Sequence, residues 1–205
     1  MDNVDKKDIA GMEDTAELAW EEISREHLIQ DEWIDFRRSV YRYPDGRIYQ
    51  PFYTYSRRDY AVIVATDEAG RALCVRQFRQ GIRRVTTEFP AGGIEDWDAD
   101  ESPRDKTARA LVAAKRELRE ETGYESDHWT HLMTVPSNAT ISDNLAYLFR
   151  AEDCRRVTSQ HLDETEVLKV RLLAESEVED LIREGNFPQA MHILAWMLAK
   201  QRKGD

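Results

Sequence analysis

The chain has 205 residues, 41% of them apolar and 34% charged, and Asp and Glu outnumber Lys and Arg by 40 to 29, which gives a net charge of −11. This acidic balance argues against general binding to nucleic acid or to anionic membranes, because both need clustered positive charge. Two cysteines exclude a disulfide scaffold and a cysteine-rich zinc site and suit a reducing compartment. No apolar stretch approaches the ~18 residues of a membrane span, and the acidic start lacks the apolar core of a signal peptide, so we expect a cytoplasmic globular protein.

The residue pattern in the first quarter of the chain predicts a small β structure. Residues 1–19 are polar and aperiodic, and we expect a flexible tail there. Aromatic and β-branched residues then gather in 33–43 and 48–55, and the Pro-Asp-Gly sequence at 44–46 between them is typical of a β-hairpin. Residues 20–58 are therefore predicted to form an N-terminal β layer.

The remainder, 59–205, alternates strand and helix patterns. The apolar runs predict strands at 60–66, 72–75, 129–135, 144–150 and 166–172. Residues 90–93, Pro-Ala-Gly-Gly, interrupt the strand pattern. Ser102 and Pro103 offer an N-cap and a first helical residue for a helix that Gly123 ends, and two further helices are expected at 174–184 and from Pro188. Strands interrupted by one helix and closed by two more predict a mixed α/β or α+β sandwich.

The first helix carries an unusual concentration of acid. Glu117, Glu120 and Glu121 are spaced i, i+3 and i+4, so a helix places all three carboxylates on one face. Hard divalent cations such as Mg²⁺ prefer carboxylate oxygens and bridge them to substrate phosphates. Such runs are also common on solvated helix faces, and Arg116 with Glu120 is an ordinary i, i+4 pair. The order of elements favours the metal hypothesis, because a strand and a glycine-rich loop precede this helix.

Residues 116–124 resemble the second half of the Nudix box, G-x5-E-x7-R-E-U-x-E-E-x-G-U, in which U is a bulky apolar residue, and they match it at every fixed position. The first half departs from the box. Seven residues rather than five separate Gly93 from Glu101, and fourteen rather than seven separate Glu101 from Arg116. The second difference is an insertion of seven residues, about two helical turns, so a longer helix keeps the same face inward.

Three flanking segments are similar to the Nudix branch that hydrolyses ADP-ribose and related nucleoside diphosphate sugars. They are Arg-Gln-Phe-Arg at 76–79, Glu-Phe-Pro-Ala-Gly at 88–92, and the acidic segment 163–166. This resemblance implies an α+β fold, an α/β/α Nudix sandwich over 59–205 preceded by the small N-terminal β domain. It also implies a homodimer in which the N-terminal layers are exchanged.

The resemblance implies a metal site on the helix. Glu117 and Glu121 would be the main ligands, with Glu120 close behind, and the backbone carbonyl of Ala91 would add a further oxygen. The implied cofactor is Mg²⁺, with Mn²⁺ as the alternative. Arg116 would hold the glutamates in place by charge-assisted hydrogen bonds.

Roles in the reaction follow from the same resemblance. Glu166 or Glu164 would take a proton from the attacking water, with Glu166 preferred because it directly precedes a strand. Arg79 would contact the diphosphate, since a guanidinium fork suits phosphate oxygens. The simpler alternatives are an acidic surface loop and an exposed arginine at a strand end.

These features predict Mg²⁺-dependent hydrolysis of the diphosphate bond of ADP-ribose or a related nucleoside diphosphate sugar, giving a nucleoside monophosphate and a sugar phosphate. Two alternatives stay open. The first is a Nudix module that binds a nucleotide sugar without cleaving it. The second is the same chemistry on GDP-mannose, NADH or a dinucleoside polyphosphate.

Overall fold

The computed structural model describes residues 16–98, 105–163 and 166–201. The chain divides into two compact units, one comprising Met1–Arg57 with Val135–Asn144 and the other Arg58–Thr134 with Leu145–Asp205. Most of the predicted tail lies outside the described residues, and a short 3₁₀ turn, Ala16–Leu18, is its described part. None of the helices in the described ranges is long and apolar enough to cross a membrane.

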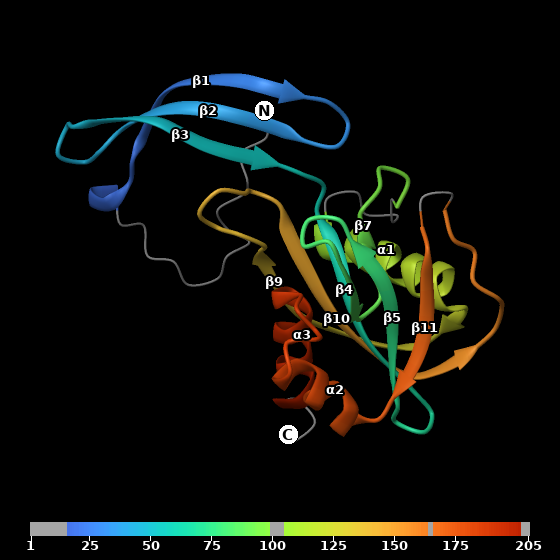
Figure 1. The fold of residues 1–205 in the computed structure, drawn as a ribbon. Helices are drawn as coiled ribbons and strands as arrows, with labels where there is room; N and C mark the ends of the chain where they lie inside the picture. The colour runs from blue at the N-terminus through green and yellow to red at the C-terminus, as the bar shows by residue number, and fades with distance from the viewer. Residues whose placement is uncertain (1–15, 99–104, 164–165, 202–205) are drawn as a thin grey trace. The chain divides into compact units, whose positions relative to one another are not determined.

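The first unit contains an antiparallel sheet of three strands in the described part of the chain (Figure 1), in the order β1 (Glu21–Gln30), β2 (Asp35–Arg42) and β3 (Ile48–Ser56). The predicted hairpin is confirmed, with the Tyr43 N–H donating to the Arg47 carbonyl at 2.9 Å. The sequence did not predict β1 because this strand is mainly polar. Cross-strand charge pairs such as Arg38 with Glu26 join it to β2, in place of an apolar alternation.

The second unit is built on a mixed sheet flanked by helices, which confirms the predicted α+β fold. Its central strands follow the order β11-β5-β4-β10-β8, while β6 pairs with β5, β7 with β4 and β9 with β10. Strand β10 runs parallel to β4, whereas β5 and β7 run antiparallel to it. The bounds are β4 Tyr60–Asp67, β5 Ala72–Arg79, β6 Arg84–Glu88, β7 Ala91–Gly93, β8 Tyr124–Glu125, β9 His128–Pro136, β10 Leu145–Arg156, β11 Leu168–Leu173, α1 Lys106–Thr122, α2 Glu175–Arg183 and α3 Ala190–Gln201.

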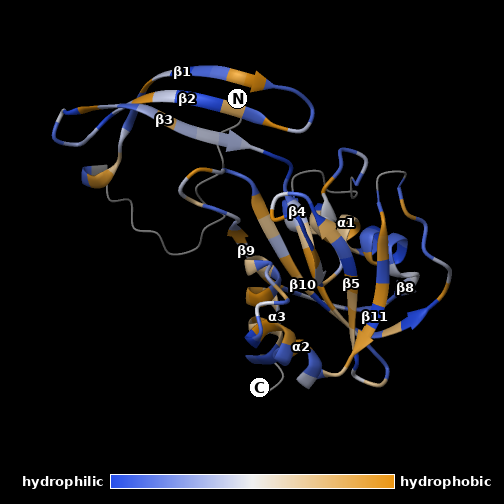
Figure 2. Ribbon diagram, in the orientation of Figure 1, coloured by the Kyte–Doolittle hydropathy of each residue, from blue (hydrophilic) through white to orange (hydrophobic). Residues whose placement is uncertain are grey.

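Strand β4 lies at the centre of the core and is buried along almost its whole length. Successive side chains of a strand point to opposite faces. Ala61, Ile63 and Ala65 therefore pack in one cluster with Ala114 and Leu118 of α1. Helix α3 also packs on β4 and β10, and apolar residues (orange in Figure 2) are prominent in β10 and α3. The sheet is thus covered by α1 on one face and by α3 on the other, as Figure 1 shows.

Two local predictions were wrong. Helix α1 begins at Lys106 rather than after Ser102, because Asp105 is its N-cap and accepts hydrogen bonds from the backbone N–H groups of Thr107 and Ala108 at 2.9 and 3.1 Å. Ser102 and Pro103 lie outside the described residues. The glycine-rich segment 90–93 does not interrupt the strand pattern as predicted, since Ala91–Gly93 form β7 and pair with β4.

Candidate active site

Helix α1 presents two of its three glutamates to the protein interior. Alanine, leucine, arginine and glutamate favour this helix. It ends as predicted at Gly123, which adopts φ +77° and donates its N–H to the Arg119 carbonyl at 2.8 Å. Glu117 and Glu121 are 8% and 2% exposed, whereas the side chain of Glu120 is 41% exposed. One helical face therefore divides into a buried pair and an outer carboxylate.

A third carboxylate completes a cluster with this buried pair. Carboxylate oxygens of Glu117, Glu121 and Glu166 all lie within 4.8 Å of one another. Glu166 comes from the segment just before β11, more than forty residues along the chain. Glu120 is not part of this cluster, and Glu164 lies outside the described residues.

The electrostatics of the cluster match a cation site. Burial raises the pKa of Glu117 to about 7; the charge of Arg116 opposes this shift, and the charges of Glu120 and Glu166 add to it. Burial raises the pKa of Glu121 well above its ordinary value, and the charge of Glu117 adds to this. Carboxylates crowded together with this little solvent need either protons or a cation. Because hard divalent cations prefer such oxygens, the donor set fits Mg²⁺.

The glycine-rich segment lies directly against these carboxylates. Ala91 donates its backbone N–H to Oε2 of Glu121 at 3.0 Å. A Cβ atom built on Gly92 would lie only 2.0 Å from Cδ of Glu117, so this position requires glycine for the carboxylate to occupy its place. Pairing of Ala91 with Val62 fixes the segment to β4. The use of the Ala91 carbonyl as a metal ligand stays a prediction.

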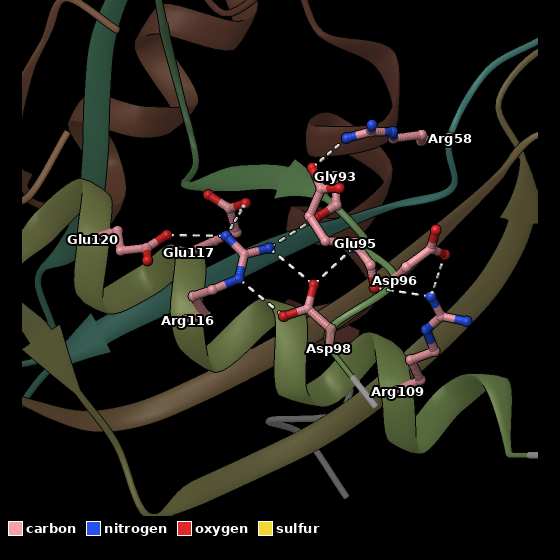
Figure 3. Close-up of polar contacts among 9 residues, drawn as sticks. All are labelled: Arg58, Gly93, Glu95, Asp96, Asp98, Arg109, Arg116, Glu117 and Glu120. Carbon is pink, nitrogen blue, oxygen red and sulfur yellow. Dashed lines mark hydrogen bonds and ion pairs between the residues drawn. The ribbon is translucent and has the colours of Figure 1, made fainter. Parts of the chain in front are cut away.

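Arg116 binds four different groups around the cluster (Figure 3). Its Nε and Nη2 donate to the two carboxylate oxygens of Asp98, both at 2.9 Å, and Nη2 also donates to the Gly93 carbonyl at 3.0 Å. Its Nη1 donates to Glu117 and Glu120 at 2.8 and 2.9 Å. The hydrogen bonds to Asp98 raise the pKa of Arg116 above its ordinary value. The role of Arg116 in holding the glutamates for catalysis stays a prediction.

Asp98 is a site residue that the sequence reasoning missed. It is 2% exposed; burial alone would raise its pKa, but hydrogen bonds from Arg116 and from the Glu95 backbone outweigh burial and lower it. The spacing of the residues could have identified Asp98, because five residues separate it from Gly92, the same number that separates glycine from the acidic residue in the first half of the Nudix box. Counting from Gly93 to Glu101, which lies outside the described residues, concealed this match. Counted from Asp98, seventeen residues precede Arg116, so the insertion is ten residues rather than seven.

The segment that leads to Glu166 is attached to the C-terminal end of α1. Gln160 Nε2 donates to the backbone carbonyl of Glu121 at 2.6 Å, and the His161 N–H donates to that of Glu120 at 2.9 Å. These are carbonyls of the last helical turn, which lack intrahelical partners. The loop that carries Glu166 is therefore fixed at its start to the helix that carries the other carboxylates.

Arg79 lies at the end of β5 and pairs with Glu88 at the end of β6, Nε to Oε1, at 2.8 Å. The charge of Arg79 is one of the influences that lower the pKa of Glu121, although burial outweighs it. The predicted contact of Arg79 with a substrate phosphate stays a prediction.

Known proteins resemble this chain in sequence and in fold. A family model described as the NUDIX domain matches residues 56–197. The ADP-ribose pyrophosphatase of Bacillus subtilis (strain 168) is 28% identical over 162 residues, 78% of this chain and 80% of that protein. The ADP-ribose pyrophosphatase of Mycobacterium tuberculosis (strain ATCC 25618 / H37Rv) is 31% identical over 142 residues, 69% of this chain and 64% of that protein.

Among solved structures, one entitled "Crystal structure of ADP compounds hydrolase" superimposes with a TM-score of 0.76 over 91% of this chain and 96% of that chain, at 20% identity. This likeness concerns the fold. With the family model matching more than two thirds of the sequence, and with its signature helix carrying the buried carboxylates of Glu117 and Glu121, the chain belongs to the Nudix hydrolase family.

Proposed function

We propose that this protein hydrolyses the diphosphate bond of ADP-ribose or a related nucleoside diphosphate sugar with the help of Mg²⁺. The observation that carries the proposal is the cluster formed by the buried Glu117 and Glu121 with the partly buried Glu166. Family membership and relatives named as ADP-ribose pyrophosphatases support the reaction and the substrate class.

Glu117 and Glu121 would hold the metal, together with the Ala91 carbonyl, and Glu120 would take part from the outer edge of the helix. A metal ion held there would lower the pKa of a bound water molecule and neutralise charge on phosphate oxygens. Mn²⁺ offers the same coordination preference and is the alternative ion.

Residues of this chain carry out proton transfer, phosphate binding and orientation of the metal ligands. A water molecule attacks one phosphorus atom, the P–O bond to the bridging oxygen breaks, and Glu166 accepts the proton that the water loses. Arg79 binds oxygens of the diphosphate, and Arg116 keeps Glu117 oriented through its hydrogen bond of 2.8 Å. The products are a nucleoside monophosphate and a sugar phosphate. Glu164, outside the described residues, is the alternative base.

We also propose a cytoplasmic homodimer. Strand β1 is exposed along nearly its whole length, and large apolar side chains of the first unit, including Trp20, Ile29 and Tyr49, are about half exposed. Exposed apolar groups of this kind are typical of protein interfaces. Cys74 and Cys154 are buried free thiols, which agrees with a reducing compartment. Sedimentation that shows only monomer at micromolar concentration would contradict the dimer.

A substrate panel tests the reaction. ADP-ribose, GDP-mannose, NADH and a dinucleoside polyphosphate are incubated with and without Mg²⁺, and the products are separated by chromatography. We expect ADP-ribose or another ADP-sugar to be cleaved fastest, with AMP as a product and only with the metal present. The variant Glu166→Gln should lose roughly 10²–10⁴-fold in turnover, the usual contribution of general base catalysis.

Two results would contradict the proposal in different ways. Turnover that is equal with and without metal would eliminate the carboxylate mechanism. Tight binding of ADP-ribose, measured by calorimetry with the intact ligand recovered afterwards, would identify a binding module instead of an enzyme.

A further inference from the structure

Glu88 is the most completely enclosed carboxylate beside the site. It ends β6 and is 0% exposed. Its Oε1 accepts the hydrogen bond from Arg79, while its Oε2 is buried and has no hydrogen-bond partner among the described residues. In the described part of the chain, the charge-assisted hydrogen bond from Arg79 is therefore the contact that holds this carboxylate.

The guanidinium of Arg79 is bound on one edge only. Its side chain is 33% exposed, and Nε is engaged by Glu88. Within the described ranges no hydrogen bond holds its two terminal nitrogens. A guanidinium offers five N–H groups in a fixed fork, so engaging Nε leaves the opposite edge free for two oxygens of one ligand.

The strand end that carries Glu88 is itself immobilised. The next residue, Phe89, donates its N–H to Nδ1 of buried His192 at 3.1 Å and packs against Phe187 with ring centroids 5.0 Å apart. Three residues beyond Glu88, Ala91 binds Glu121. The same short segment therefore fixes Glu88 relative to α3 and to the carboxylate cluster.

We infer that Glu88 is a positioning residue for the reaction: it fixes Arg79 by its Nε edge and so directs the two terminal nitrogens toward the diphosphate of the substrate. The inference rests on the proposed function, in which Arg79 binds the diphosphate. Glu88 itself touches no substrate atom in this scheme, because it is fully buried behind the guanidinium.

A double-variant cycle tests the inference. KM and kcat for ADP-ribose with Mg²⁺, and the affinity for inorganic pyrophosphate with Mg²⁺ by calorimetry, are measured for wild type, Glu88→Gln, Arg79→Ala and the double variant. Glu88→Gln should weaken pyrophosphate binding and raise KM about tenfold, the size of one charge-assisted hydrogen bond. In the Arg79→Ala background it should change neither quantity further.

Two more variants sharpen the result. Asp67→Asn removes another buried carboxylate, 8% exposed, that binds Arg71 at the turn between β4 and β5, and it should leave KM unchanged. Arg79→Lys keeps the charge but loses the planar fork that can hold Glu88 on one edge and two phosphate oxygens on the other. We therefore expect Arg79→Lys to lose nearly as much affinity as Arg79→Ala, a readout that does not depend on whether Glu88→Gln folds.

The outcomes separate this inference from the proposed function. If the losses of pyrophosphate affinity caused by Glu88→Gln and Arg79→Ala multiply in the double variant, the role of Glu88 is overturned. An unchanged pyrophosphate affinity in Glu88→Gln would overturn it as well. If wild type fails to cleave ADP-ribose but the pyrophosphate cycle stays non-additive, the proposed substrate fails while the positioning role stands.

Discussion

Arg116 and Asp98 are joined by two parallel hydrogen bonds, Nε to Oδ1 and Nη2 to Oδ2, each 2.9 Å long. Paired contacts of this kind restrict both the position and the rotation of a guanidinium. The third nitrogen, Nη1, then points at Glu117 and Glu120. Asp98 thus orients the carboxylate cluster without belonging to it.

Asp98→Asn should lower kcat by about 10–100-fold, as is usual for residues that orient metal ligands, while the protein still folds. Asparagine keeps the shape but accepts only one of the two hydrogen bonds. The matched control is Asp96→Asn, because Asp96 is a fully exposed partner of Arg109 in the same loop. Steady-state kinetics with saturating Mg²⁺ make the comparison, and equal activity of the two variants would refute the role of Asp98.

The helix and its acidic face could be predicted from spacing, because i, i+3 and i+4 place side chains on one face whatever lies opposite. Which carboxylate turns inward could not be predicted. Glu120 and Glu121 are adjacent, and only the position of the sheet and of β7 decides that Glu121 is buried while Glu120 stays at the edge. The approach of Glu166 likewise depends on contacts between distant segments, so local patterns carry no information on it and only the family resemblance indicated it.

Burial against the sheet makes the charged form of Glu121 energetically unfavourable. We expect a bound cation to offset this free-energy cost. We expect Glu121→Gln to abolish metal-dependent turnover, by at least about 100-fold, since Mg²⁺ supplies several kcal/mol of charge stabilisation. Without metal, the same variant should be more stable than wild type by roughly 0.5–2 kcal/mol, because it removes a buried carboxylate whose pKa burial raises.

Urea denaturation in EDTA and thermal melts with added Mg²⁺ test this expectation. Wild type should gain melting temperature with Mg²⁺, and Glu121→Gln should not. The control is Glu120→Gln, whose carboxylate is 41% exposed and lies outside the cluster, and which should retain more activity than Glu121→Gln. A Glu121→Gln protein that is less stable than wild type in EDTA would contradict the electrostatic account.

Gly92→Ala should inactivate the enzyme without unfolding it. The added Cβ would fall 2.0 Å from Cδ of Glu117, and the flexible end of that side chain can move away at little cost to the fold. Movement of one ligand by about 1 Å is enough to cost on the order of 100-fold in rate. The matched control is Gly81→Ala, where a Cβ meets nothing within 4 Å. Steady-state kinetics and the melting temperatures of both variants test this prediction. Full activity of Gly92→Ala would mean that Glu117 is not held against this loop during turnover.

His192 gives the protein a pH dependence of stability that is separable from catalysis. Burial, with a smaller effect of the Arg79 charge, lowers the pKa of His192 to about 3 from its ordinary 6.5. Above pH 6.5 the imidazole is neutral in both the folded and the unfolded chain and adds no pH dependence. Below pH 6.5 only the unfolded chain takes up the proton, so stability falls as pH drops toward 3, by about 1.4 kcal/mol for each pH unit.

The raised pKa values of Glu117 and Glu121 act in the opposite direction, since they favour the folded protein at low pH. The contribution of His192 is therefore obtained from the difference in pH dependence of the free energy of unfolding between wild type and a variant that lacks this histidine. His192→Gln keeps an acceptor for the Phe89 N–H but cannot take up a proton. Between pH 7 and pH 5 the free energy of unfolding of wild type should fall by roughly 2 kcal/mol more than that of His192→Gln. Parallel curves for wild type and His192→Gln in urea titrations would show that the buried imidazole is not held neutral by the fold.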